Sequence, residues 1–169
     1  ARARRVITIR RAKPSDAPAM ARVHLSTWRS TYAGVLPSAY LTSLSALREG
    51  AQYEQAILER RGGHAAFVAV ADGFETPGGG IVGFVTGGLS RRPQIAEGEV
   101  ETLYLLDDFR GRGVGRRLMR AMASHLASLG AQSAFAWVLA ANPSRWFYER
   151  LGARLAAREE LSFAGSRLE

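Results

Sequence analysis

The sequence predicts an α/β fold in which a mixed sheet of six to seven strands carries about four helices on its two faces. One observation is that short β-branched or apolar runs alternate with stretches of helical spacing, in the order β-α-α-β-β-β-α-β-α-β. Another is that some strands follow one another directly, as in hairpins, whereas others are separated by a helix, as in crossovers. The 169 residues contain no repeat, low-complexity tract or linker, which predicts one domain over 1–169.

The first third of the chain is expected to supply one strand and then helices. The β-branched run at residues 6–10 predicts the first strand. Either Ser15 or Asp16 can cap the helix that follows, and Pro18 suits its first turn. A second helical stretch covers residues 38–60 and is interrupted near residues 43–45.

The middle of the chain is expected to supply three consecutive strands. Residues 65–71 and 81–89 are apolar and predict a hairpin with a loose, turn-rich loop over residues 72–80. Residues 99–106 predict a third strand, which leads into a glycine-rich turn. Strands that follow each other this directly pair as antiparallel neighbours.

The last third is expected to hold two helices and the closing strands. Apolar side chains recur every three or four residues over 114–129, and Gly130 fits the left-handed position that follows a helix. Residues 134–139 predict another buried strand. Asn142, which precedes a proline, predicts the cap of a short helix, and residues 153–163 predict one or two closing strands.

The composition argues against several functions. The chain has no cysteine, which excludes disulfides, thiolate metal sites and cysteine nucleophiles. The net charge is +8, but the basic residues are scattered, so we expect no nucleic-acid partner. The three histidines share no spacing, which predicts no metal. No apolar run approaches the roughly 18 residues of a membrane span and no leader is visible, so we expect no membrane partner and a cytoplasmic location.

The sharpest motif is Arg110-Gly111-Arg112-Gly113-Val114-Gly115, between a predicted strand and an amphipathic helix. Its glycines let backbone N–H groups turn toward a ligand, and the helix N-terminus adds unpaired donors with partial positive charge. Together with the arginines, this pattern predicts a pyrophosphate site. A Walker A turn needs Gly-Lys-Ser/Thr, and the dinucleotide fingerprint needs glycine where Arg116 stands. A glycine-rich loop with solvated arginines is the alternative on these residues alone.

This motif resembles the Gln/Arg-x-x-Gly-x-Gly/Ala motif of the GNAT acetyltransferases. Residues 99–105 resemble the fourth strand of that family, and Asn142 together with residues 147–153 resembles a later family motif. The opening residues 9–17 and the stretch 28–44 are also similar to family members, so the resemblance covers nearly the whole chain.

The sequence departs from the family pattern at three places. Asp107 stands where many members have proline, and Arg145 where alanine is frequent. The end of the chain is short for a full seventh strand. None of these departures touches the glycine-rich turn.

The resemblance implies a GNAT fold, with a mostly antiparallel sheet that splays between strands 4 and 5 and holds acetyl-CoA as co-substrate. The pantetheine arm would pair with the backbone of Leu103 and Leu105 like an added strand, and the pyrophosphate would lie on the amides of residues 112–116. The residues that the resemblance assigns to the cofactor are Leu103, Tyr104, Leu105, Arg110, Gly111, Arg112, Gly113, Val114, Gly115, Arg116 and Asn142.

The implied reaction is direct attack of an amine on the thioester, which needs a base, an oxyanion donor and an acid. Glu97, Glu99 and Glu101 alternate, so we expect them on one face, roughly 7 Å apart in succession, where mutual repulsion raises a pKa. The family position favours Glu99 as the base, with Glu101 second; solvated edge charges or cation-binding groups are the alternative. A backbone N–H near Leu105 is expected to stabilise the oxyanion, and Tyr148 to protonate the thiolate.

The acceptor is expected to be an amine of a small molecule or a peptide. Trp28 and Tyr32 lie where the family builds its acceptor pocket, with core packing as the alternative for Trp28. The alternative for Tyr148 is an ordinary position in the core rather than a catalytic role. The alternative for Asn142 is a plain helix cap rather than a contact with the cofactor. Family members are often dimers, which makes a homodimer one expected arrangement. The second function class is a module that binds acyl-CoA without turnover, but Glu99 and Tyr148 are both present and favour an enzyme.

Overall fold

The structure is a computed structural model that describes residues 5–74, 79–159, 161–163 and 166–168. The described residues form two compact units, one within 1–27 and 45–136 and the other within 28–44 and 137–169. The first unit holds the main sheet and the helices that cover it, whereas the second holds shorter elements. Part of the turn-rich loop predicted over 72–80 lies outside the described residues.

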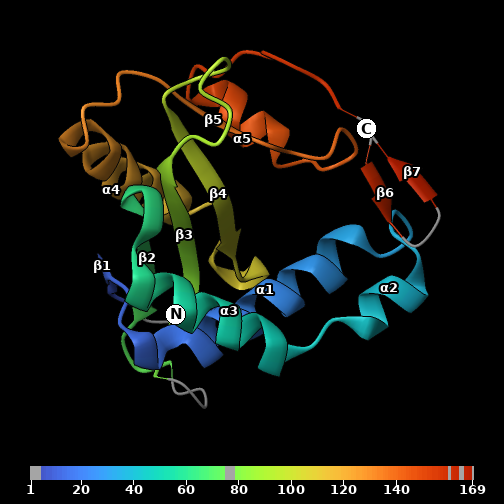
Figure 1. Cartoon of the computed structure of the whole chain (residues 1–169). Coiled ribbons are helices and arrows are strands. Elements are labelled where there is room, and N and C mark those ends of the chain that lie inside the picture. Colours follow the sequence, from blue (N-terminus) through green and yellow to red (C-terminus); the bar gives the residue numbers. More distant parts are fainter. Residues whose placement is uncertain (1–4, 75–78, 160, 164–165, 169) are drawn as a thin grey trace. The chain divides into compact units, whose positions relative to one another are not determined.

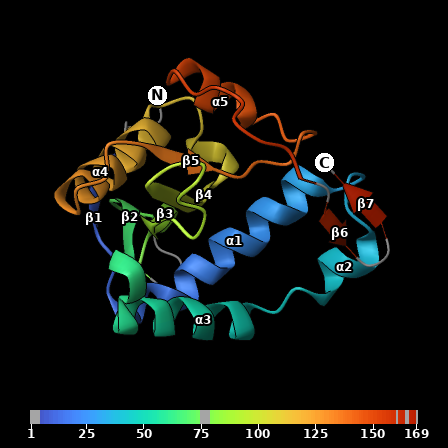
Figure 2. The ribbon, with the colours of Figure 1, turned by 45° about the horizontal axis from the view of Figure 1, so that its top comes forward.

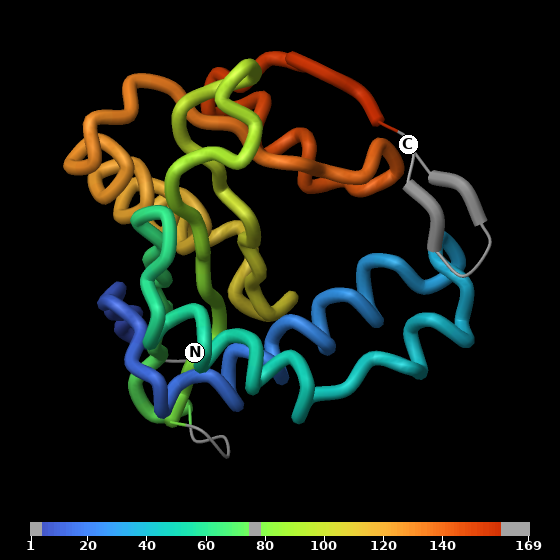
Figure 3. The backbone as a smooth tube through the Cα atoms, viewed as in Figure 1, coloured from blue at the N-terminus to red at the C-terminus, as the bar shows by residue number. Residues whose placement is uncertain are grey.

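Five strands of the first unit form one sheet, in the order β1-β2-β3-β4-β5. Their bounds are β1 (Ile7–Arg11), β2 (Ala65–Ala71), β3 (Ile81–Leu89), β4 (Gly98–Leu105) and β5 (Ala134–Ala136). The first four are antiparallel to their neighbours, and β5 runs parallel to β4. In Figure 3 the colour of the tube changes from green to yellow along the neighbouring strands β2, β3 and β4. The predicted mixed, mostly antiparallel sheet is confirmed, and its one parallel pair follows from the helix that connects β4 to β5.

One face of the sheet is covered by α4 (Val114–Ser128), and the opposite face by α1 (Ala17–Tyr32) and α3 (Ala46–Glu59), as Figures 1 and 2 show. The buried side chains of α4 are three or four residues apart and form one stripe: Val114, Leu118, Met122 and Leu126. They pack with Val82 and Val85 of β3. On the other face, Met20 of α1 and Ile57 of α3 pack with Phe84 of β3. Burying these apolar side chains is the main term that stabilises the unit.

The ends of the first helices follow from local polar contacts. The short 3-10 helix η1 (Pro14–Asp16) precedes α1, and the Asp16 carboxylate accepts a 2.7 Å hydrogen bond from the Lys13 N–H. Lys13 is the N-cap of η1, so the helical turn begins before both Ser15 and Asp16, the caps that the sequence offered. Asp16 instead bonds back to Lys13 from the third position of the turn, and Arg10 pairs with it through Nη1 at 2.7 Å. The stretch 38–60 divides into α2 (Ser38–Ser43) and α3 because Ser45 caps the latter, accepting from the Arg48 N–H at 3.3 Å.

A β-bulge interrupts the pairing of β4 with β3. Thr102 lies opposite Thr86 and Val100 opposite Gly87, so Glu101 is an extra residue between them. The backbones approach closely here, because a Cβ added to Gly87 would lie 2.5 Å from the Glu99 carbonyl oxygen. The bulge therefore breaks the alternation of side chains along β4 at the carboxylates that the sequence analysis singled out.

The second unit contains α2, α5 (Arg145–Arg150) and a separate antiparallel pair, β6 (Leu161–Phe163) with β7 (Ser166–Leu168). Its buried cluster consists of Tyr32, Leu36 and Leu41. The prediction of six to seven strands in one sheet was wrong in number, because β6 and β7 pair with each other and the main sheet has five strands. The described part of the chain contains five α-helices, one more than the four or so expected, because residues 38–60 form two helices.

Two further 3-10 helices complete the first unit, η2 (Arg61–Gly63) before β2 and η3 (Asp107–Phe109) after β4. The strand expected over 134–139 stops at Ala136, and the helix expected from Asn142 begins at Arg145 with Ser144 as its N-cap. In the ranges that the structure describes, no helix combines the length and the hydrophobicity needed to cross a bilayer.

Candidate functional site

The glycine-rich turn adopts the backbone geometry that the sequence predicts. Gly111 and Gly113 have φ angles of +72° and +76°, a region that L-residues with a side chain rarely occupy. Gly113 is the N-cap of α4 and makes no side-chain capping bond, so the first amides of the helix have no partner of that kind. A Cβ at Gly113 would meet no protein atom within 4 Å, which places open space beside this position.

The arginines around the turn have different surroundings. Arg110 donates from Nε to the Leu105 carbonyl oxygen at 3.4 Å and pairs with Asp107 at 3.2 Å. Asp107, which replaces the proline of many family members, thus anchors Arg110 beside the turn. The guanidinium of Arg112 lies 5.5 Å from the centre of the Phe109 ring, and Arg116 is exposed. Three positively charged side chains therefore belong to the turn and to the first turn of α4, whose amides have no side-chain cap.

Among the residues that the structure describes, no strand pairs with one edge of β4 beyond its first residues. β5 pairs only with Gly98, Glu99 and Val100, and the ladder ends there. The Leu106 N–H donates to the Val82 carbonyl oxygen of β3 at 2.8 Å, so by alternation the N–H and C=O groups of Leu103 and Leu105 point to the opposite edge. The end of this ladder thus leaves the N–H and C=O groups of Leu103 and the N–H of Leu105 placed to pair with an extended ligand, whereas the Leu105 carbonyl oxygen already accepts from Arg110.

Glu99 is held in an ion pair rather than poised as an open base. It is only 2% exposed, and its carboxylate accepts from Arg91 Nη2 at 2.7 Å and Nε at 3.2 Å. Burial opposes ionisation of Glu99, but the hydrogen bonds and charge of Arg91 outweigh it and lower its pKa below the usual value. The expectation that repulsion between carboxylates raises a pKa here was wrong for Glu99, because Arg91 supplies the compensating charge.

Glu101 is the more accessible carboxylate of β4. Its side chain is 35% exposed, and its Oε2 lies 4.0 Å from Nε2 of His64, the residue that precedes β2. Burial lowers the pKa of His64, which favours the neutral imidazole. The expected alternation of Glu97, Glu99 and Glu101 on one face was wrong, because β4 begins at Gly98 and the bulge falls at Glu101.

A buried polar cluster on the same unit was not expected from the sequence. The Tyr53 hydroxyl lies 2.8 Å from Nδ1 of His24, and the His24 ring stacks on Tyr104 with centroids 4.8 Å apart. Burial raises the pKa of Tyr53, and it lowers the pKa of His24 to about 4. His24 and Tyr53 are 29 positions apart and lie on different helices, so no local pattern in the sequence predicts the contact.

The buried His24 predicts a loss of stability in mild acid. Its folded pKa of about 4 lies below the reference of 6.5, so its contribution is complete above pH 6.5 and is lost as the pH falls toward 4. The free energy of unfolding should fall by about 2 kcal/mol between pH 7 and pH 5 from this group alone. Urea unfolding of wild type and His24→Gln at the two pH values checks this. The difference in the free energy of unfolding between pH 7 and pH 5 should be smaller in the variant than in wild type. An equal loss in wild type and variant would contradict it.

The second unit contains the remaining candidates. The Tyr32 hydroxyl is 2.7 Å from the Asn142 amide nitrogen, and the Asn142 carbonyl oxygen accepts from the Ser144 N–H at 2.9 Å. Trp28 and Tyr32 pack edge to face with centroids 4.9 Å apart, and Tyr32 is buried in the core of this unit. These contacts favour packing for Trp28 and Tyr32 and a positioning role for Asn142.

Tyr148 lies on α5 and is partly buried. Burial, with a smaller contribution from Tyr32, raises the pKa of Tyr148 to about 12. Its phenol therefore keeps its proton at neutral pH. Within the described residues no hydrogen bond engages the hydroxyl, and no group of three or more histidine or acidic side chains is placed to bind a metal.

Comparison with known proteins agrees with this geometry. Residues 81–162 match the family model described as FR47-like protein. The chain is 32% identical over 165 residues to an uncharacterised N-acetyltransferase of Bacillus subtilis, YuaI, covering 97% of this chain and 90% of that protein. It is 29% identical over 151 residues to a probable N-acetyltransferase of Mycobacterium tuberculosis, covering 85% and 78%.

Solved structures share the fold. The PaiA N-acetyltransferase of Thermoplasma acidophilum, in complex with coenzyme A, aligns with a TM-score of 0.72 at 17% identity over 96% of both chains. The aminoglycoside N-acetyltransferase AAC(6')-Iy, in complex with CoA, aligns with a TM-score of 0.65 at 19% identity over 96% of this chain and 97% of its own. The fold and the turn thus define a GNAT-type acyltransferase architecture. The chain belongs to the GNAT superfamily of N-acetyltransferases.

Proposed function

We propose that this protein transfers the acetyl group of acetyl-CoA to an amine of a small molecule or peptide, by direct attack in a ternary complex. The observation that carries the proposal is that one unit holds both an edge of β4 without a strand partner among the described residues and a glycine-rich turn at the start of α4. The first suits an extended amide-bearing arm and the second suits a pyrophosphate, and acetyl-CoA contains both. Relatives described as N-acetyltransferases support the same activity.

The proposed cofactor contacts are made by main-chain groups. Leu103 and Leu105 would pair with the amides of the pantetheine arm, and the amides of residues 112–116 would hold the pyrophosphate. When bound, acetyl-CoA supplies an activated thioester. The N–H of Leu105, which points to the open edge, is the candidate donor to the oxyanion that forms on attack.

Glu101 is the proposed proton acceptor for the attacking amine. A base must reach the proton that it removes, and Glu101 is partly exposed whereas Glu99 is 2% exposed and bound by Arg91. The order of preference that the family position suggests is therefore reversed in this proposal. Glu99 instead holds Arg91, and with it the connection from β3 to β4, in place.

Tyr148 is the proposed donor of the proton that the leaving thiolate takes up. Its raised pKa of about 12 keeps the phenol protonated, so the hydroxyl is available as a donor. We expect Tyr148→Phe to lower kcat about 10-fold while the Kd for acetyl-CoA stays unchanged. Initial rates and calorimetric binding on the same preparation check this. An unaltered kcat would remove Tyr148 from the role.

Product analysis tests the proposed function. The protein is incubated with acetyl-CoA that bears an isotope-labelled acetyl group and with pools of polyamines, amino acids, aminoglycosides and peptides. We expect the label in an amide of one class of amine, identified by mass spectrometry, which also names the acceptor. Label that stays in acetyl-CoA or appears only as acetate, with every pool, would contradict an amine acetyltransferase.

A further inference from the structure

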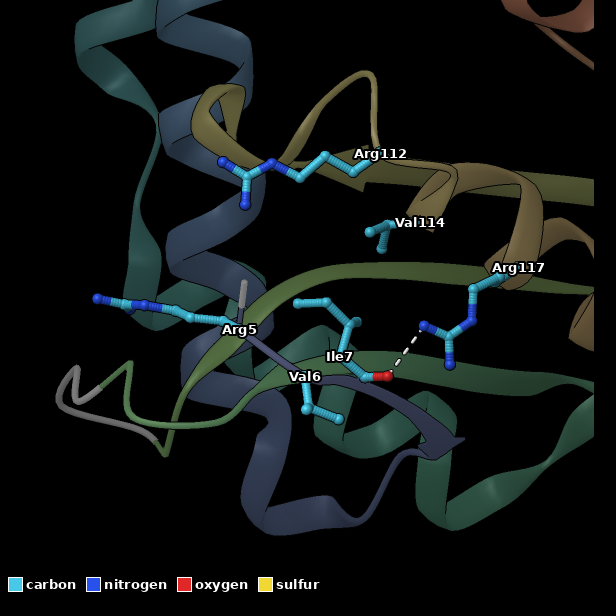
Figure 4. Close-up of a pocket in the computed structure, with 6 residues that line it drawn as sticks. All are labelled: Arg5, Val6, Ile7, Arg112, Val114 and Arg117. Carbon is cyan, nitrogen blue, oxygen red and sulfur yellow. Dashed lines mark hydrogen bonds between the residues drawn. The ribbon is translucent and has the colours of Figure 1, made fainter. Parts of the chain in front are cut away.

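A pocket of about 270 Å³ lies between the start of β1 and the start of α4 (Figure 4). β1 is separated from β4 by two strands, so this pocket is distinct from the open edge of β4. Three arginines and three aliphatic side chains line it: Arg5, Val6, Ile7, Arg112, Val114 and Arg117. No acidic residue is among them, so the lining is strongly positive.

Two of these arginines are held in place by an aromatic pair. The guanidinium of Arg5 lies 5.1 Å from the centre of the Phe74 ring, and that of Arg112 lies 5.5 Å from the centre of Phe109. Phe74 and Phe109 pack edge to face with centroids 5.3 Å apart. A guanidinium that stacks on a ring face keeps its N–H groups at the edge available as donors. The aromatic contacts therefore position Arg5 and Arg112 without using their hydrogen-bond donors.

The third arginine is held by the backbone. Arg117 Nη1 donates to the Ile7 carbonyl oxygen at 2.9 Å, the dashed contact in Figure 4, and its other N–H groups are not used by that bond. In the described ranges of the chain, Arg5, Arg112 and Arg117 form no ion pair with a carboxylate. Three permanent positive charges around one small cavity repel each other, and an anion in the cavity would relieve that repulsion.

We propose that this pocket binds a phosphomonoester. The fork of N–H donors on arginine matches the oxygens of a phosphate, and the three positive charges more than balance the two negative charges of a phosphomonoester dianion. Val6, Ile7 and Val114 supply an apolar wall for the group that carries the phosphate. The phosphomonoester is either the 3′-phosphate of acetyl-CoA, an assignment that rests on the proposed function, or that of a separate phosphorylated small molecule.

The test is calorimetric titration of wild type, Arg5→Gln and Arg117→Gln with three probes: acetyl-CoA, acetyl-dephospho-CoA and phenyl phosphate. Arg120→Gln is the matched control, because Arg120 is an exposed arginine of α4 that does not line the pocket. If the cofactor supplies the phosphate, each pocket variant should bind acetyl-CoA about 10-fold more weakly and acetyl-dephospho-CoA as wild type does. If a separate ligand supplies it, phenyl phosphate should bind wild type alongside acetyl-CoA and lose about 10-fold in affinity in the same variants.

Arg5→Gln keeps the proposal testable even if Arg117→Gln unfolds, since Arg5 makes no bond to the sheet backbone among the described residues. Unchanged binding of all three probes in Arg5→Gln, or weakening equal to that of Arg120→Gln, would overturn the phosphomonoester site. Failure of acetyl-CoA to bind wild type would instead count against the proposed function. The titrations with phenyl phosphate would then test the phosphomonoester site by themselves.

Discussion

Replacing Gly113 by valine should weaken acetyl-CoA binding at least about 100-fold. Gly113 has a φ angle of +76° and open space where a Cβ would stand, so a branched side chain would fill the space beside the amides that we assign to the pyrophosphate. The left-handed conformation would also cost about 1–2 kcal/mol for any L-residue, which strains the turn. Calorimetric titration with acetyl-CoA measures the loss.

Gly130→Val separates the ligand effect from backbone strain. Gly130 follows the other end of α4, has a φ angle of +88°, and also has no atom within 4 Å of an added Cβ. The Gly130→Val variant should lose about as much stability in thermal unfolding as Gly113→Val does, but it should bind acetyl-CoA as wild type does. Full cofactor affinity in a folded Gly113→Val variant would show that the turn does not hold the pyrophosphate.

Glu101→Gln should lower kcat about 100- to 10,000-fold, the range typical for loss of a general base. Glutamine keeps the shape of the side chain and its place beside His64 but cannot accept a proton from the amine. The Kd for acetyl-CoA should not change, since Glu101 is not among the groups assigned to the cofactor. Initial rates at saturating acetyl-CoA measure the effect.

Two neighbouring carboxylates supply controls for Glu101. Glu97→Gln changes an exposed residue just outside β4 and should leave kcat unchanged. Glu99→Gln breaks the pair with Arg91 and should mainly lower stability, by about 1–3 kcal/mol. If Glu99→Gln instead lost turnover while folded, and Glu101→Gln kept it, Glu99 would be the base.

The parts of the fold that the sequence predicts are those with local causes. The α4 stripe repeats every three or four residues, and the turn before it needs only two glycines and the helix that follows, so both can be read from adjacent residues. The bulge at Glu101 depends on how close β3 comes at Gly87, which no pattern within β4 reveals. For that reason the alternation of Glu97, Glu99 and Glu101 was misleading.

The same reasoning explains the candidate site. Arg91 reaches Glu99 from the loop after β3, and Tyr53 meets His24 across two helices, so these partners depend on tertiary contacts. The pocket at β1 unites Arg5 with Arg117, which are far apart in the sequence. Arg110 of the glycine-rich motif and Arg117 of α4 are only seven positions apart, but in the structure Arg110 contacts Leu105 and Arg117 contacts Ile7.

The measurement that tests the central claim most directly is release of free thiol from acetyl-CoA in the presence of amines. The chain contains no cysteine, so a chromogenic thiol reagent reports only CoA. We predict amine-dependent release that saturates with both substrates and gives intersecting lines when each is varied, as direct attack in a ternary complex requires. Saturable binding of acetyl-CoA without thiol release for any amine would contradict the account and favour a module that binds acyl-CoA without turnover.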